Sequence, residues 1–128
     1  MILKQNLTRF TCKNPLFKGL YCTKTAFLQI NKIIKTKQNT IGIKIFLRKS
    51  GCLGFKYKIT LIDNLSELSP NEIVFKKEKI HIYINNKDIT FIDGIIIDFI
   101  KNNFSKSFQF HNTKIQQFCG CGKSFNIF

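Results

Sequence analysis

The first half of this chain of 128 residues contains no acidic residue, since the first one along the sequence is Asp63. Residues 1–62 carry thirteen basic side chains, whereas residues 63–128 carry eight basic against seven acidic ones. The sequence also lacks a run of about 18 uncharged apolar residues, which excludes a membrane-spanning helix. The chain is too short for a multidomain enzyme. Its hydrophobic content of 44% argues against a disordered chain and predicts a single packed domain.

Tryptophan is absent and alanine occurs once, whereas isoleucine, lysine and asparagine occur 21, 19 and 12 times. All three abundant residues have A/T-rich codons, so a biased genome explains much of the net charge of +14. Only Arg9 and Arg48 are arginines, and specific nucleic-acid sites depend on the forked arginine side chain. We therefore expect no nucleic-acid partner and no membrane partner. The alternative left open is a real electrostatic role, such as docking an acidic protein.

Residues 1–19 are expected to form a basic N-terminal tail that precedes a domain at 20–128. The segment contains Lys4, Arg9, Lys13 and Lys18 and no acid, which is the composition of an organelle transit peptide. No continuous apolar stretch of about 7–15 residues occurs there, so it is not a secretory signal. Two alternatives remain: a cytoplasmic bacterial protein with an uncleaved tail, or an organellar protein with a transit segment.

Alternating apolar residues predict strands across most of the chain. The clearest are residues 41–47 and 55–61, and further strands are expected at 73–76, 79–84, 95–100 and 107–111. One segment, from Ala26 to Ile34, has helical spacing, with Thr25 as its expected cap. A second helical turn is possible near 86–92, and Asp93-Gly94 indicates a turn. The fold class is therefore mainly β with one or two helices, an α+β domain.

The cysteines fall into two groups. Cys52 lies in Ser-Gly-Cys-Leu-Gly between the two clearest strands, close to several basic residues that favour the thiolate. Cys119 and Cys121 are separated and followed by glycine, a spacing that lets both thiols bind one metal ion but strains a disulfide. Cys12 and Cys22 are expected to be small core residues. The odd number of cysteines argues for a reducing compartment.

Three thiolates are one short of the four that iron–sulfur clusters commonly take. A fourth ligand from His111, His81, glutathione or a partner would complete the set. Alternatively, two chains would pair and share one cluster between six thiolates. A closed structural zinc site would require four ligands on rigid turns, which this set does not supply.

Four sequence motifs resemble the A-type iron–sulfur carrier family, the IscA/SufA/HesB group. They are SGCLGFKY at 50–57, FIDG at 91–94 with DF at 98–99, FQFHN at 108–112 and CGCGKSF at 119–125. The stretches at 17–20 and 108–112 are most similar to the SUF-type member, SufA. Three positions depart from the family pattern: Leu53, Thr113 and Lys123 replace the usual serine or alanine, proline and glutamate.

The resemblance implies a two-sheet β-sandwich or half-barrel of the HesB-like type with a flexible, cysteine-containing C-terminal tail. It implies a homodimer or homotetramer, and Cys52, Cys119 and Cys121 as ligands of a [2Fe–2S] or [4Fe–4S] cluster. The cluster would be received from a SUF-type scaffold complex and passed to apo-proteins. The alternative function is a mononuclear iron donor, for which Lys123 removes one carboxylate ligand.

The remaining candidates have simpler interpretations. His111 and His81 are expected to face solvent or cap a strand rather than bind metal. Asp93 and Asp98 suggest paired carboxylates, but Asp93 is better explained as a turn residue. Since no phosphate loop, Ser-His-Asp set or HExxH motif occurs, we expect no enzymatic activity.

Overall fold

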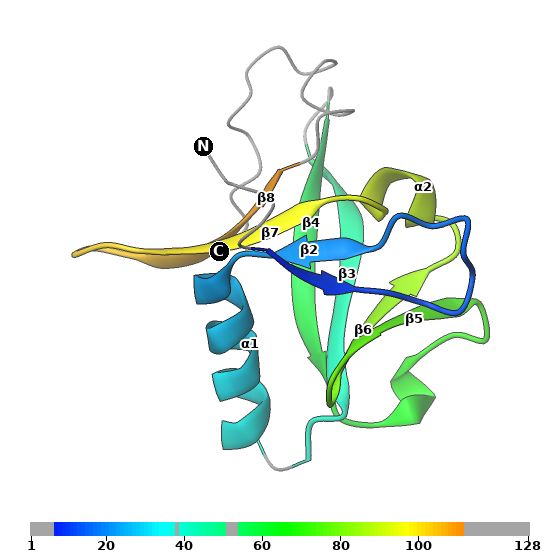
Figure 1. Cartoon of the computed structure of the whole chain (residues 1–128), viewed down its shortest axis with the longest axis horizontal. Helices are drawn as coiled ribbons and strands as arrows, with labels where there is room; N and C mark the ends of the chain where they lie inside the picture. The colour runs from blue at the N-terminus through cyan, green and yellow to red at the C-terminus, as the bar shows by residue number, and fades with distance from the viewer. Residues whose placement is uncertain (1–6, 38, 51–53, 112–128) are drawn as a thin grey trace.

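The structure is a computed structural model, and it describes residues 7–37, 39–50 and 54–111. Eight strands form two four-stranded sheets, with α1 beside them (Figure 1). The elements are β1 (Thr8–Phe10), β2 (Leu20–Cys22), α1 (Lys24–Thr36), β3 (Gly42–Ser50), β4 (Gly54–Ile62), η2 (Leu65–Glu67), β5 (Glu72–Lys77), β6 (Ile80–Asn85), α2 (Ile89–Ile92), β7 (Ile96–Lys101) and β8 (Lys106–His111). The predicted mainly β fold with two helices is confirmed. Among the described helices, none is long and apolar enough to cross a membrane.

The sheet with the longer strands has the order β4-β3-β6-β5 and contains the two strands that the sequence predicts best. β3 and β4 pair antiparallel over nine positions, from Gly42 opposite Ile62 to Ser50 opposite Gly54. Ile45 and Tyr57 are fully buried, so the alternating apolar positions face the core as predicted. The intervening residues point to the other face, which is the arrangement expected when one face of a sheet is solvated.

The second sheet has the order β1-β2-β7-β8 and combines strands from both ends of the described chain, with β1 and β8 at its opposite edges. β2 pairs parallel with β7, with Tyr21 opposite Ile96. Sequence analysis missed β1 and β2 because three residues are too few to show alternation. Phe10 and Leu20 are nevertheless fully buried, so both strands contribute to the core. The predicted division at residue 19 stays a prediction, although β1 precedes it and pairs with β2.

The helix α1 begins one residue after Thr23, which caps it in place of the predicted Thr25. The Thr23 hydroxyl accepts a hydrogen bond from the Ala26 backbone N–H at 3.3 Å and donates one to Asp98 Oδ1 at 2.7 Å. Thr25 lies inside the first turn, where its hydroxyl also donates to Asp98, at 3.3 Å. The prediction of Thr25 was wrong because either threonine satisfies a local capping pattern, and only the distant Asp98 favours Thr23.

The turn at Asp93-Gly94 ties the start of β2 to the start of β7. Gly94 has a φ of +89°, a conformation that favours glycine, which explains the predicted turn. The Asp93 carboxylate accepts hydrogen bonds from the backbone N–H groups of Lys18 and Gly19, both at 2.8 Å. The Gly94 N–H donates to the Gly19 carbonyl at 2.7 Å. Asp93 therefore has a structural role that connects residues 74 and 75 positions apart.

The ion pair between Lys44 and Glu72 joins β3 to β5 within the sheet β4-β3-β6-β5, with the Glu72 side chain only 4% exposed. Glu72 Oε2 accepts from Lys44 Nζ at 3.1 Å, from Ser69 Oγ at 2.8 Å and from Asn85 Nδ2 at 3.1 Å. Burial alone would raise the pKa of Glu72, but these hydrogen bonds and the lysine charge lower the pKa below its ordinary value of 4.5. The ionised carboxylate therefore stabilises the folded chain.

We expect the Glu72 carboxylate to contribute stability above pH 4.5 that is lost as the pH falls through its lower folded pKa. Glu72→Gln should therefore be less stable than the native chain at neutral pH, with the difference shrinking in acid. Urea unfolding midpoints at neutral and acidic pH measure this effect. Glu78→Gln, in the exposed turn between β5 and β6, should keep the native profile. A constant offset between Glu72→Gln and the native chain at every pH would contradict the prediction.

Candidate functional site

All three predicted cluster ligands, Cys52, Cys119 and Cys121, lie outside the described residues. The structure does describe the chain that leads to them. The β3–β4 pairing extends to Ser50 opposite Gly54, so Cys52 belongs to the three-residue connection between these strand ends. His111 ends β8, eight residues before Cys119. The β3–β4 hairpin and β8 are therefore the described elements that anchor the segments with the predicted ligands.

The end of β8 is fixed against β4, the strand that follows Cys52. The rings of Phe110 and Tyr57 stack with centroids 5.3 Å apart, and both side chains are fully buried. The Tyr57 hydroxyl donates a hydrogen bond to the Phe91 carbonyl at 3.0 Å, and Phe91 in turn stacks on Phe55 at 6.5 Å. α2 and β8 thus both pack against the arm of the hairpin that leads to Cys52. Sequence analysis did not predict these contacts, since aromatic residues at strand spacing do not indicate which strands meet.

The other two cysteines are not arranged to bind metal. Cys22 is fully buried, and burial raises the pKa of its thiol far above the ordinary value, so the thiol stays protonated. Cys12 is partly buried, and its Sγ lies 3.5 Å from the Asn14 carbonyl. The prediction that both are packing residues agrees with their contacts, since both belong to or pack against the core cluster. In the described ranges no group of three or more His, Cys, Asp or Glu side chains could hold a metal ion.

The two histidines lie apart from one another in the fold. His81 is on β6, where its ring stacks on Tyr83 with centroids 6.3 Å apart. His111 is partly buried at the end of β8, adjacent in sequence to Phe110. Of the two, only His111 lies on the element that leads to Cys119 and Cys121. A role of His111 as an additional ligand stays a hypothesis.

The outer face of the β3–β4 hairpin next to Cys52 is basic. We call Arg48, Lys49, Lys56 and Lys58 the hairpin cations; they line a hollow of about 230 Å³. Arg48 lies directly opposite Lys56 in the antiparallel register, and Arg48, Lys49 and Lys56 are exposed. The strands therefore present a concentrated positive charge beside the segment that carries Cys52. A nearby positive charge stabilises a thiolate and other anions.

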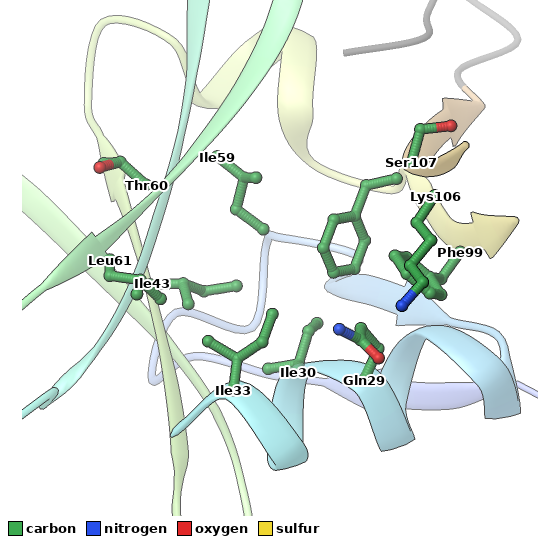
Figure 2. A pocket seen from close by; sticks show the side chains of 11 residues that line it. Gln29, Ile30, Ile33, Ile43, Ile59, Thr60, Leu61, Phe99, Lys106 and Ser107 are labelled. Atoms are coloured by element: carbon green, nitrogen blue, oxygen red, sulfur yellow. The ribbon is translucent and has the colours of Figure 1, made fainter. Parts of the chain in front are cut away.

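A separate apolar cavity of about 450 Å³ lies between α1 and the two sheets (Figure 2). The side chains of Ile30, Ile33, Ile43 and Ile59 point into it, and Gln29 and Lys106 also line it. β4 contributes its residues 59–61, which are farther along the chain from Cys52 than the hairpin cations. The cavity is thus distinct from the segment that carries the predicted ligand, and the sequence patterns gave no sign of it.

Comparison with known proteins gives a consistent result. A family model described as iron-sulphur cluster biosynthesis matches residues 19–123. An uncharacterized protein of Buchnera aphidicola subsp. Acyrthosiphon pisum is 42% identical, with 97% of this chain and 98% of that protein covered. The iron-sulfur cluster assembly protein SufA of Escherichia coli is 30% identical, with 92% of this chain and 94% of that protein covered.

The solved structures agree with the sequence comparison. The crystal structure of Escherichia coli SufA superposes with a TM-score of 0.70 at 26% identity, over 91% of this chain and all of that one. The crystal structure of IscA with the [2Fe–2S] cluster has a TM-score of 0.65 at 21% identity, over 85% of this chain and 98% of that one, and shows the shared fold. The resemblance predicted from the cysteine and aromatic motifs is therefore confirmed.

Proposed function

The chain belongs to the iron-sulphur cluster biosynthesis family, the group of the A-type carriers, and from this membership we propose that it is a non-enzymatic carrier of iron–sulfur clusters. It would bind a cluster transiently, receive it from a SUF-type scaffold and pass it to apo-proteins. The cluster is the cargo of such a protein rather than a resident cofactor. The similar bacterial proteins support a place in the bacterial cytoplasm, with an organelle as the alternative if residues 1–19 are a transit segment.

We assign the cluster to Cys52, Cys119 and Cys121, and the observation that supports this choice is the stacking of Tyr57 on Phe110. Cys52 lies five residues before Tyr57, and an extended chain spans at most about 3.3–3.6 Å per residue, so Cys52 lies within about 18 Å of this contact. Cys119 lies nine residues after Phe110, which gives it a reach of about 32 Å. The chain lengths therefore allow all three thiols to meet within one subunit.

A shared cluster between two copies of the chain would supply the missing ligand. Two subunits would offer six thiolates, of which a cluster commonly uses four. The proposed assembly is therefore a homodimer, or a homotetramer built from two dimers, with the cluster at a subunit interface. IscA has been crystallised with a [2Fe–2S] cluster, which supports this cluster type; a [4Fe–4S] cluster is the other possibility.

Mononuclear iron binding is the second candidate function, because the similar protein IscA of Escherichia coli, 30% identical over 80% of this chain, is named an iron-binding protein. In that case the chain would donate iron to cluster assembly without carrying sulfide. Lys123, which replaces the family's frequent glutamate, removes an oxygen ligand that mononuclear iron would favour. The cluster-carrying function is therefore the preferred proposal.

Anaerobic reconstitution of the full chain with iron and sulfide tests the proposal. We expect visible charge-transfer absorption, equal amounts of iron and acid-labile sulfide, and Mössbauer parameters of a cluster. Ultracentrifugation should show at least a dimer in the loaded form. Iron without labile sulfide would support the mononuclear alternative. A protein that binds no iron and shows no visible absorption would refute both functions.

A further inference from the structure

Three of the hairpin cations, Arg48, Lys56 and Lys58, share one face of the β3–β4 hairpin, and Lys49 lies beside them on the alternate position, opposite Phe55 in the register. The alternation that buries Ile45 and Tyr57 turns Arg48 and Lys56 to the opposite face. Among the described residues, those that line the hollow of about 230 Å³ are all cationic, namely Arg48, Lys49, Lys56 and Lys58. Clustered cationic side chains attract anions such as carboxylates.

In the part of the chain that the structure describes, three of the hairpin cations, Arg48, Lys49 and Lys56, form no ion pair with an acidic side chain. All seven lie in the described part of the chain, where an ion pair joins Glu72 to Lys44 and none is found with Arg48, Lys49 or Lys56. The other acidic side chains have different surroundings. Asp93 and Asp98 accept hydrogen bonds from backbone N–H groups and threonines, Asp63 accepts one from Thr40, and Glu67 accepts one from the Asp63 backbone. Glu78 lies in an exposed turn, and Asp88 is buried. The described acidic side chains thus leave Arg48, Lys49 and Lys56 available for the carboxylates of a partner.

The arrangement works against the stability of the hairpin itself. Arg48 and Lys56 face each other in the antiparallel register, and like charges directly opposite each other destabilise a strand pair. Neither side chain gains a salt bridge in the described part of the chain that would offset this repulsion. An anionic surface placed against the hairpin would relieve it. The hairpin is thus better suited to a charged complex than to the isolated domain.

We propose that the hairpin cations are the docking surface for an acidic protein that exchanges clusters with this chain, an inference that rests on the proposed carrier function. Cluster transfer requires the partner to approach the cysteines closely, and the cations border the segment that carries Cys52. Partner carboxylates would enter the hollow and align that segment with the partner's ligands. Nucleic acid is disfavoured because only one of the four is arginine.

Arg48→Glu separates a docking role from a structural one, because it should raise the stability of the hairpin while it slows cluster transfer. Glutamate opposite Lys56 replaces a repulsion with an attraction, so the thermal unfolding midpoint should rise by about 1–4 °C. Transfer of the cluster to the apo form of an acidic [2Fe–2S] ferredoxin should slow by about tenfold at low ionic strength, because electrostatic steering is lost. Lys24→Glu, at the exposed start of α1, changes the net charge equally and should transfer at the native rate.

The measurement normalises each transfer rate to the labile sulfide bound per subunit, so that a loading defect is not mistaken for a docking defect. The native rate should fall steeply with added salt and approach that of Arg48→Glu. Equal slowing by Arg48→Glu and Lys24→Glu would overturn the proposal, as would a native rate independent of salt. A weaker affinity of Arg48→Glu for duplex DNA with unchanged transfer would assign the surface to nucleic acid instead. Absence of any bound cluster would refute the carrier function and is recognised before transfer is measured.

Discussion

Cys52→Ser is expected to remove most of the visible absorption of the anaerobically reconstituted protein. A serine hydroxyl is a poor substitute for a thiolate, which is the ligand that iron–sulfur clusters require. Changes to residues outside the first coordination sphere already cost about 10–100-fold in metal affinity, so the loss of a direct ligand should cost at least that much. Cys119→Ser and Cys121→Ser should each have a similar effect, because the proposed site uses all three thiols.

Cys12→Ser is the matched control for this prediction, since it makes the same atomic change at a cysteine outside the proposed site. Cys12 is partly buried and its Sγ donates to the Asn14 carbonyl, a hydrogen bond that a serine hydroxyl can also make, so serine should be tolerated and the absorption retained. Cys22 is unsuitable as a control because it is fully buried. Iron and labile sulfide analysis of all variants, with circular dichroism to verify folding, decides the result. Native-like cluster content in Cys52→Ser would refute the assigned ligand set.

Phe110→Ala should produce the largest loss of stability among the substitutions considered, about 3–5 kcal/mol in the free energy of unfolding. Phe110 is fully buried, stacks on Tyr57, and lies where β8 leads into the segment with Cys119 and Cys121. Its removal leaves a cavity between β4 and β8 and weakens the anchor of that segment. We therefore expect weaker cluster retention as well as a lower midpoint in urea unfolding.

Phe104→Ala provides the control, because it makes the same substitution in the same hairpin at a side chain that is 97% exposed. Its unfolding free energy should differ from the native value by less than about 0.5 kcal/mol. Since small domains are marginally stable, Phe110→Leu serves as a milder variant if Phe110→Ala does not fold. A similar effect of Phe110→Ala and Phe104→Ala would show that the stacking on Tyr57 contributes little.

The sequence predicted the parts of the fold that repeat a local pattern. Alternation placed Ile43, Ile45 and Tyr57 on the buried face because one side of a hairpin must cover the core. The pattern could not show that Asp93 binds the backbone of Lys18 and Gly19, since nothing local connects residues 75 positions apart. The choice of Thr23 over Thr25 depended on Asp98 for the same reason.

The candidate site was predicted by a different route. Cysteine spacing alone left the fourth ligand open, and the assignment of Cys52, Cys119 and Cys121 came from the resemblance to a family. That family is now shown, whereas the three ligands lie outside the described residues and stay predictions. The sequence indicated that Arg48, Lys49 and Lys56 lie close to Cys52 along the chain. Their common hollow and the lack of an ion pair at Arg48, Lys49 and Lys56 required the structure.

The parallel pairing of β2 with β7 has a consequence for biosynthesis. Tyr21 finds its partner Ile96 only after 75 further residues have been synthesised. Loop closure on this scale delays folding, and high contact order slows it. The β3–β4 hairpin, by contrast, can form from a continuous stretch while the polypeptide is still emerging from the ribosome. β2, one of the earliest strands to leave the exit tunnel, is therefore among the last to pair fully, and the nascent chain exposes apolar surface to chaperones until translation is nearly complete.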